Sequence, residues 1–218
     1  MPFRAVIFDL DNTIHDKSAT LRAVAKRLHA DHHLSSAGVK LDDWLTEFLA
    51  LNNLRIEKTE VFERLKSAFT LTEATSQYLL KDYNANLGSQ AQPYPGAIEC
   101  LAACKVAGLK VGLVTNGRDS FQRSKIAGLG AFPHIDVIYT SGSFGAKKPN
   151  LTIFEACLKA LDVHPADVAV VGDDRCCDID PAIALGMTPI WKSSEQAGDV
   201  ALSTHDFQRI QAYLTSGA

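Results

Sequence analysis

Side chains capable of nucleophilic, acid–base and metal-binding chemistry stand directly after several apolar runs of this sequence. The runs are 6–8, 111–114, 137–139 and 168–171. The polar residues that follow them are Asp9, Asp11, Thr115, Asn116, Lys148, Asp173, Asp174 and Asp178. An aspartate such as Asp9 can open a phosphate ester only where a lysine and a divalent cation neutralise the meeting anions. This set contains a lysine, a hydroxyl and enough carboxylates to meet that requirement.

The apolar runs are typical of strands that are buried on both faces of a parallel sheet. A shorter candidate strand covers 189–191, and segments such as 154–161 and 179–184 have helical spacing. Strands that alternate with helices predict an α/β fold with a parallel sheet and right-handed crossovers. Because the carboxyl ends of parallel strands meet at one edge, where ligands bind, we expect the polar residues to converge there.

One long stretch breaks this alternation. From Asp16 to about Gln90 there is no β run, but there are several segments with helical spacing, including the one that holds Trp44 and Phe48. Turn and breaker residues at 92–96 mark the return to the sheet. We therefore expect a catalytic core formed by residues 1–15 and 91–218, and an inserted helical domain at 16–90, here called the helical insertion. Trp44 and Phe48 are expected in its core.

The polar motifs together resemble the phosphatase branch of the haloacid dehalogenase superfamily. The superfamily pattern DxDxT is present at 9–13, VTNG at 114–117, a lysine before proline at 148–149 and GDxxxxD at 172–178. The resemblance spans nearly the whole core. It implies a Rossmann-like, doubly wound parallel sheet with an all-helical cap after the first motif. It also implies a magnesium-dependent phosphatase that forms an aspartyl phosphate on Asp9.

The carboxylates that follow the predicted strands are suited to bind a magnesium ion. Asp9 and Asp173 supply hard oxygen ligands, and magnesium keeps several waters beside a few protein ligands. By resemblance, the main-chain carbonyl of Asp11 is a third ligand. Asp178 then acts directly, through water or by orienting Lys148.

The resemblance also assigns the remaining catalytic roles. Asp11 protonates the leaving alcohol and later activates the water that hydrolyses the intermediate. Thr115 and the main-chain N–H of Asn116 hold the phosphoryl oxygens, and Lys148 spreads positive charge over them.

The composition narrows the remaining classes of function. A chain of 218 residues with 46% hydrophobic and 22% charged residues is typical of a folded globular protein. A formal net charge of -3 gives no basic footprint for nucleic acid. We find no signal peptide or membrane-spanning run, and five cysteines lack zinc-site spacing. We expect a cytoplasmic enzyme acting on a small-molecule phosphate ester, with no nucleic-acid or membrane partner and an open oligomeric state.

Other polar residues are interpreted as ordinary surface. Lys147, beside Lys148, is expected to be a solvated loop lysine. Arg55, Lys58 and Arg64 alternate with glutamates, which is typical of a solvated helix face with local ion pairs. His15 follows the first motif at a position that the family pattern leaves free, so contact with a leaving group stays the minor alternative.

Four other functions share parts of this pattern of residues. A dehalogenase of the same fold needs neither magnesium nor the second acid, so Asp11 argues against it. A phosphomutase keeps every core residue and stays open. A phosphorylated signalling receiver places its aspartate on a later strand, and a silent scaffold is not indicated because every required polar group is present.

Overall fold

The computed structural model describes residues 3–54 and 56–216. It contains one six-stranded sheet in which every neighbouring pair of strands is parallel, in the order β3-β2-β1-β4-β5-β6. The strands are β1 (Ala5–Phe8), β2 (Lys110–Thr115), β3 (Val137–Thr140), β4 (Val168–Gly172), β5 (Thr188–Trp191) and β6 (Leu202–Ser203). The predicted parallel α/β sheet is confirmed, and β6 is an addition that the sequence did not reveal.

Helices cover both faces of the sheet, so the fold has three layers. The helices of the core are α5 (Ala97–Val106), α6 (Asp119–Gly128), α7 (Ser141–Phe144), α8 (Leu151–Leu161), α9 (Asp180–Ala184) and α10 (Phe207–Thr215). Short helical turns lie at η3 (Phe132–His134), η4 (Pro165–Asp167) and η5 (Arg175–Ile179). In β1, Val6 and Phe8 belong to the hydrophobic cluster that includes α5, α6 and α10, whereas Ala5 and Ile7 belong to the one that includes α8.

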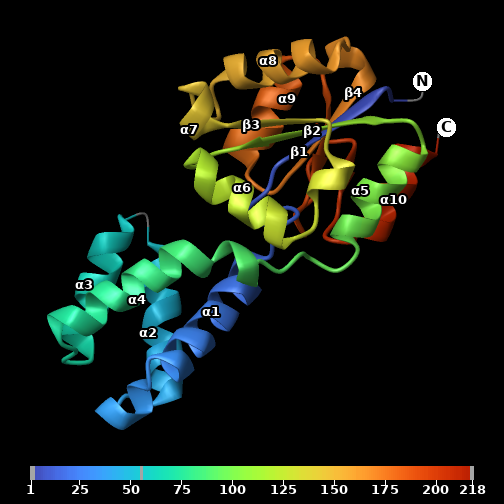
Figure 1. Cartoon of the computed structure of the whole chain (residues 1–218). Helices are drawn as coiled ribbons and strands as arrows, with labels where there is room; N and C mark the ends of the chain where they lie inside the picture. Colours follow the sequence, from blue (N-terminus) through green and yellow to red (C-terminus); the bar gives the residue numbers. More distant parts are fainter. Residues whose placement is uncertain (1–2, 55, 217–218) are drawn as a thin grey trace.

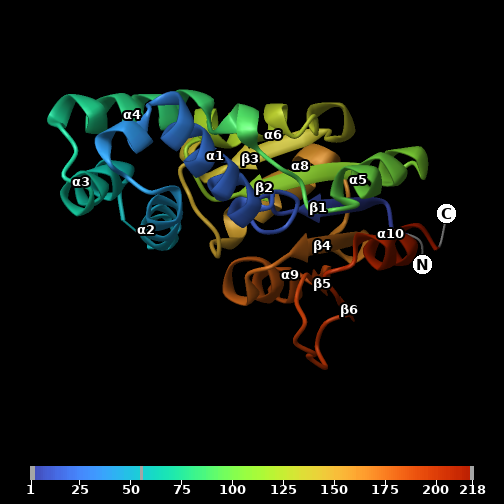
Figure 2. The ribbon, with the colours of Figure 1, turned by 90° about the horizontal axis from the view of Figure 1, so that it is seen from below.

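The stretch between β1 and α5 is helical throughout its described elements. It consists of α1 (Lys17–Asp31), η1 (Leu34–Ala37), α2 (Leu41–Asn53), α3 (Lys58–Ala68), α4 (Glu73–Asn86) and η2 (Gly88–Gln90). These helices form a group beside the sheet, beyond one end of it (Figures 1 and 2). They share a hydrophobic cluster in which Trp44 and Phe48 are fully buried.

The two chain segments that join this helical insertion to the sheet lie side by side. The main-chain N–H of Asp16 donates to the carbonyl of Gln92 at 2.8 Å, and that of Tyr94 donates to Ile14 at 2.9 Å. Asp16 also caps α1, because its side chain accepts a hydrogen bond from the Ala19 N–H at 2.8 Å. Helix α1 therefore starts directly at the junction.

A second connection runs through two glycines. The turn η2, at the end of the insertion, packs against α6 of the core. A Cβ atom added to Gly128 would lie 1.8 Å from the Gly88 carbonyl oxygen, and one added to Gly88 would lie 2.6 Å from the backbone of Ser124. Only glycine allows the two backbones to approach this closely.

None of the described helices is long and apolar enough to cross a membrane.

The glycine contact predicts a specific loss of stability. Gly128→Ala should lower the free energy of unfolding by about 1–3 kcal/mol, because η2 must move away from α6 to make room. Urea unfolding would measure the change. Gly198→Ala is the control, since a Cβ there meets nothing within 4 Å and should change stability by less than about 0.5 kcal/mol. Equal midpoints for Gly128→Ala and the unaltered chain would contradict the prediction.

Candidate active site

Asp9 and Lys148 form the centre of the site. Asp9 follows β1, and its main-chain N–H donates to Val171 of β4 at 2.9 Å, so the residue is fixed where these two strands leave the sheet. The Lys148 Nζ lies 2.7 Å from an Asp9 oxygen, 2.6 Å from an Asp178 oxygen and 2.9 Å from the Val114 carbonyl. These contacts use all three hydrogens of the ammonium group. One buried cation thus serves two buried carboxylates.

A third carboxylate adds to this negative charge. One oxygen each of Asp9, Asp173 and Asp178 lie within 4.8 Å of one another. Burial and the neighbouring Asp9 raise the pKa of Asp173 to about 6. Burial also raises the pKa of Asp178, and Asp9 adds to the effect although Lys148 opposes it. Three carboxylates against one lysine leave a surplus of negative charge, and their hard oxygen atoms fit a divalent cation such as Mg²⁺.

Local backbone structure brings Asp178 into this group. It lies in η5, a π-helical turn, and one of its oxygens accepts from the Asp174 N–H at 3.1 Å. The Asp174 side chain in turn accepts from the Cys177 N–H at 3.0 Å. A Cβ on Gly172, the last residue of β4, would lie 2.4 Å from the Asp178 carboxyl group. Glycine at 172 is therefore required for Asp178 to reach Lys148.

Thr115 and Asn116 close the opposite side of the site. Gln122 Nε2 donates to Thr115 Oγ1 at 2.7 Å, so the Thr115 hydroxyl hydrogen is free to point to a phosphoryl oxygen. The Asn116 side chain donates to the Lys148 carbonyl at 3.0 Å and accepts from the Lys148 N–H at 2.8 Å. The amide group of Asn116 thus fixes the loop of Lys148, which leaves its main chain for a phosphate.

The Asp11 carboxylate lies outside the group of Asp9, Asp173 and Asp178, here called the trio. It contacts Lys125 Nζ at 2.6 and 2.7 Å, His15 Nδ1 at 2.6 Å and Gln122 Nε2 at 3.1 Å. Burial alone would raise the pKa of Asp11, but Lys125 and His15 outweigh it and hold that pKa well below its ordinary value. The Asp11 side chain is therefore an ionised acceptor here.

His15 links Asp11 to the junction with the insertion. Its Nε2 lies 2.8 Å from the Thr20 hydroxyl of α1, and that hydroxyl accepts from the Gln92 N–H at 2.9 Å. With Nδ1 donating to Asp11, Nε2 can accept the Thr20 hydrogen, which satisfies each group in the chain. The buried His15 thus supports Asp11 directly, although the sequence pattern left its position free.

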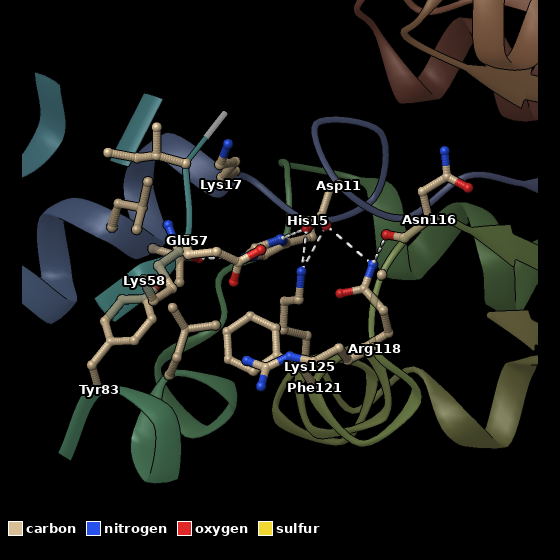
Figure 3. Close-up of a pocket in the computed structure, with 16 residues that line it drawn as sticks. Asp11, His15, Lys17, Glu57, Lys58, Tyr83, Asn116, Arg118, Phe121 and Lys125 are labelled. Atoms are coloured by element: carbon tan, nitrogen blue, oxygen red, sulfur yellow. Dashed lines mark hydrogen bonds and ion pairs between the residues drawn. The ribbon is translucent and has the colours of Figure 1, made fainter. Parts of the chain in front are cut away.

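Two cavities meet at Asp11. One, of about 150 Å³, is lined by the trio, Thr115 and Lys148. The other, of about 320 Å³, lies between the helical insertion and α6 (Figure 3). Asp11 and Asn116 line both cavities. A phosphoryl group in the smaller cavity would therefore have its leaving group beside Asp11, at the mouth of the larger one.

The structure agrees with the predicted exposure of Lys147 and Arg64 but not with that of Lys58. Lys147 is exposed, as predicted, and Arg64 forms the predicted exposed ion pair with Glu60. The interpretation of Lys58 as a solvated residue was wrong, because it is half-buried and lines the larger cavity. Arg55 lies outside the described residues.

Gln122 and Lys125 are site residues that the sequence interpretation missed. They lie three positions apart on α6, the helix that follows β2, so both face the carboxyl end of the sheet. The signal in the sequence was their helical spacing of three residues in the segment that follows Thr115.

Comparison with known proteins places these residues in a family. A family model described as haloacid dehalogenase-like hydrolase matches residues 3–186. A glyceraldehyde 3-phosphate phosphatase of Methanocaldococcus jannaschii is 30% identical over 86% of this chain and 83% of its own length. A phosphoglycolate phosphatase of Thiobacillus denitrificans is 24% identical over 79% of this chain and 76% of its own. The putative HAD-hydrolase YfnB of Bacillus subtilis shares the fold, with a TM-score of 0.74 and 19% identity over 98% of this chain and 99% of that one.

The shared lysine predicts a large stability effect. Burial alone would lower the pKa of Lys148, but Asp9 and Asp178 raise it above its ordinary value. Lys148→Met should lower the free energy of unfolding by about 3–5 kcal/mol at pH 7 in chelator, because both carboxylates lose their cation. Urea unfolding measures this, with Lys147→Met as the matched control. A loss no greater than that of the control would contradict the assignment.

Proposed function

We propose, from the premise that this chain belongs to the haloacid dehalogenase-like hydrolase family and is a phosphohydrolase, that it hydrolyses small-molecule phosphate monoesters through an aspartyl phosphate on Asp9. The observation that carries the proposal is the pairing of Asp9 with Lys148 inside a trio of carboxylates. Lys148 gives the buried nucleophile a neighbouring cation, and the three carboxylates carry more negative charge than Lys148 offsets, which favours binding of a metal ion. We take Mg²⁺ as the metal because all of the ligands are oxygen atoms.

In the first step, a carboxylate oxygen of Asp9 forms a bond to phosphorus while the bond from phosphorus to the leaving oxygen breaks. Lys148 offsets the charge of Asp9, and the Thr115 hydroxyl donates to a phosphoryl oxygen. Asp9, Asp173 and Asp178, with the main-chain carbonyl of Asp11, would hold Mg²⁺. When bound, the metal supplies the positive charge that lets two anions approach.

Asp11 transfers the proton in both steps. In the first step the leaving oxygen takes a proton from Asp11, which must gain one beforehand because Lys125 and His15 favour its ionised form. His15 Nδ1, at 2.6 Å, is the adjacent group that can supply it from the doubly protonated ring, in which Nε2 donates to the Thr20 hydroxyl. In the second step, ionised Asp11 takes a proton from the water that attacks the aspartyl phosphate, and Asp9 is released.

The helical insertion acts as a cap over this chemistry. We place the core at residues 1–15 and 91–218 and the cap at 16–90, hinged where Asp16 and Gln92 lie side by side. The larger cavity between them holds the leaving group, and closure would exclude water from the intermediate. Relatives named for glyceraldehyde 3-phosphate and phosphoglycolate support small phosphate esters as the substrate class.

Substitution of the nucleophile tests the mechanism. With magnesium and a panel of phosphate monoesters, Asp9→Asn should lower the release of inorganic phosphate by about four orders of magnitude or more. Asp11→Asn should lower it by about two to four orders, because only proton transfer is lost. Asp43→Asn, on the exposed surface of α2, is the matched control. Full activity of Asp9→Asn would falsify the mechanism, and an isomerised ester without free phosphate would indicate a mutase.

Removal of the metal gives a second test. Activity should vanish in chelator and return with Mg²⁺, whereas Ca²⁺ should restore it poorly because its larger and more flexible shell misplaces the nucleophile. Asp173→Ala should raise the Mg²⁺ concentration needed for half-maximal activity, and calorimetry should show weaker Mg²⁺ binding. Undiminished turnover in chelator would remove magnesium from the proposal.

A further inference from the structure

The larger cavity combines an apolar lining with unpaired cations. Leu21, Ile56 and Leu87 contribute apolar surface, and Tyr83 and Phe121 lie with ring centroids 6.3 Å apart. Figure 3 shows Lys17, Lys58 and Arg118 spaced around this cavity. A ligand that extends from the smaller cavity past Asp11 would meet these residues.

The charges of the larger cavity do not balance. Asp11 and Lys125 offset each other through their ion pair. Among the lining residues that the structure describes, Glu57 is then the one remaining carboxylate, against the cations Lys17, Lys58 and Arg118. Three other basic residues of these helices form ion pairs, Arg27 with Asp82, Arg64 with Glu60 and Lys66 with Glu73. Within the cavity, the described side chains leave a surplus of positive charge.

Lys58 is held in place by neutral partners. Its Nζ donates to Asn52 Oδ1 at 2.7 Å and lies 5.6 Å from the centroid of the Tyr83 ring. Asn52 is itself buried and donates to the Phe48 carbonyl at 2.9 Å. These contacts orient the ammonium group but leave its charge uncompensated. An anion in the cavity would supply the missing compensation.

We propose that this cavity binds a leaving group that carries a second anionic group, a carboxylate or a phosphate, and that Lys58 and Arg118 select it. The inference rests on the proposed phosphatase function and narrows its substrate class. A neutral aromatic leaving group stacked on Phe121 is the rival occupant. An aromatic leaving group would explain the rings of Tyr83 and Phe121, but it would give the three cations of the cavity no role.

The test compares esters that differ only in the second anion. The pairs are 3-phosphoglycerate with glycerol 3-phosphate, and 6-phosphogluconate with sorbitol 6-phosphate. Sorbitol 1,6-bisphosphate distinguishes a second phosphate from a carboxylate. For the full chain with magnesium, kcat/KM should be about 10-fold or more higher for the anionic member of at least one pair, as expected for one charge-assisted hydrogen bond.

Variants of the cavity show which residues carry the preference. Lys58→Met should lower kcat/KM for the anionic ester by about 10- to 100-fold and leave the neutral ester nearly unchanged. Arg118→Met should act in the same direction, and it is exposed enough to leave the fold intact. Glu57→Gln should increase the preference. Arg64→Met, on the same helix as Lys58 but outside the lining, is the matched control.

The pH profile adds a second readout. Burial, and after it Lys17 and Lys125, lower the pKa of Lys58 to about 8, whereas Glu57 opposes the shift. Tyr83 stays neutral in this range, because burial and Asp11 raise its pKa. Protonated Lys58 binds the anion, so kcat/KM for the anionic ester should fall as the pH rises through about 8. The ratio of the two esters should lose this pH dependence in Lys58→Met.

Affinity in the Asp9→Asn background separates the inference from the proposed function. Calorimetry gives the dissociation constant of each ester without turnover. Selective binding without hydrolysis in the unaltered chain would refute the phosphatase proposal and keep the anion site. Equal kcat/KM and equal affinity within both pairs, or a preference that survives both Lys58→Met and Arg118→Met, would overturn the inference. A stronger preference for an ester of a neutral aromatic alcohol would likewise overturn it.

Discussion

The crowding of negative charge at the carboxyl end of β1 and β4 constrains the rest of this structure. Asp9, Asp173 and Asp178 are brought together where the strand order reverses, the usual ligand position in an open parallel sheet. Lys148 offsets part of that charge, and all three hydrogens of its ammonium group are used in bonds to Asp9, Asp178 and the Val114 carbonyl. The surrounding loops serve this arrangement: Gly172 makes room for Asp178, and Asn116 fixes the Lys148 backbone.

A separate electrostatic balance surrounds Asp11. Its carboxylate is turned from the trio toward Lys125 and His15, so two neighbouring aspartates of one motif have different partners. These different environments suit the proposed division, in which Asp9 is the nucleophile and Asp11 transfers protons. Asp11 lines both cavities, and in the proposed mechanism the bond to be broken lies between them.

Much of the fold and the membership of the site could be predicted from the sequence. Apolar runs revealed β1 to β5, because buried parallel strands leave a continuous signal, whereas the two residues of β6 are too few for one. The grouping of Asp9, Lys148, Asp173 and Asp178 followed from their place after strands. Lys58 was misread because its neighbouring glutamates suggest a solvated helix. Its burial depends on how α3 packs against α4, which carries Tyr83, and local sequence does not encode that packing.

The hydrogen bonds that hold Asp11 also connect it to the helical insertion. Thr20 belongs to α1, Gln92 to the returning segment, and both reach Asp11 through His15. The glycine contact between η2 and α6 lies on the helix that carries Gln122 and Lys125, the other partners of Asp11. A movement of the insertion about this junction would therefore shift the surroundings of the proton-transferring group as well as the walls of the leaving-group cavity. Under the proposed mechanism, closure of the cap and proton transfer would thus be linked, because the elements that would enclose the leaving group also position Asp11.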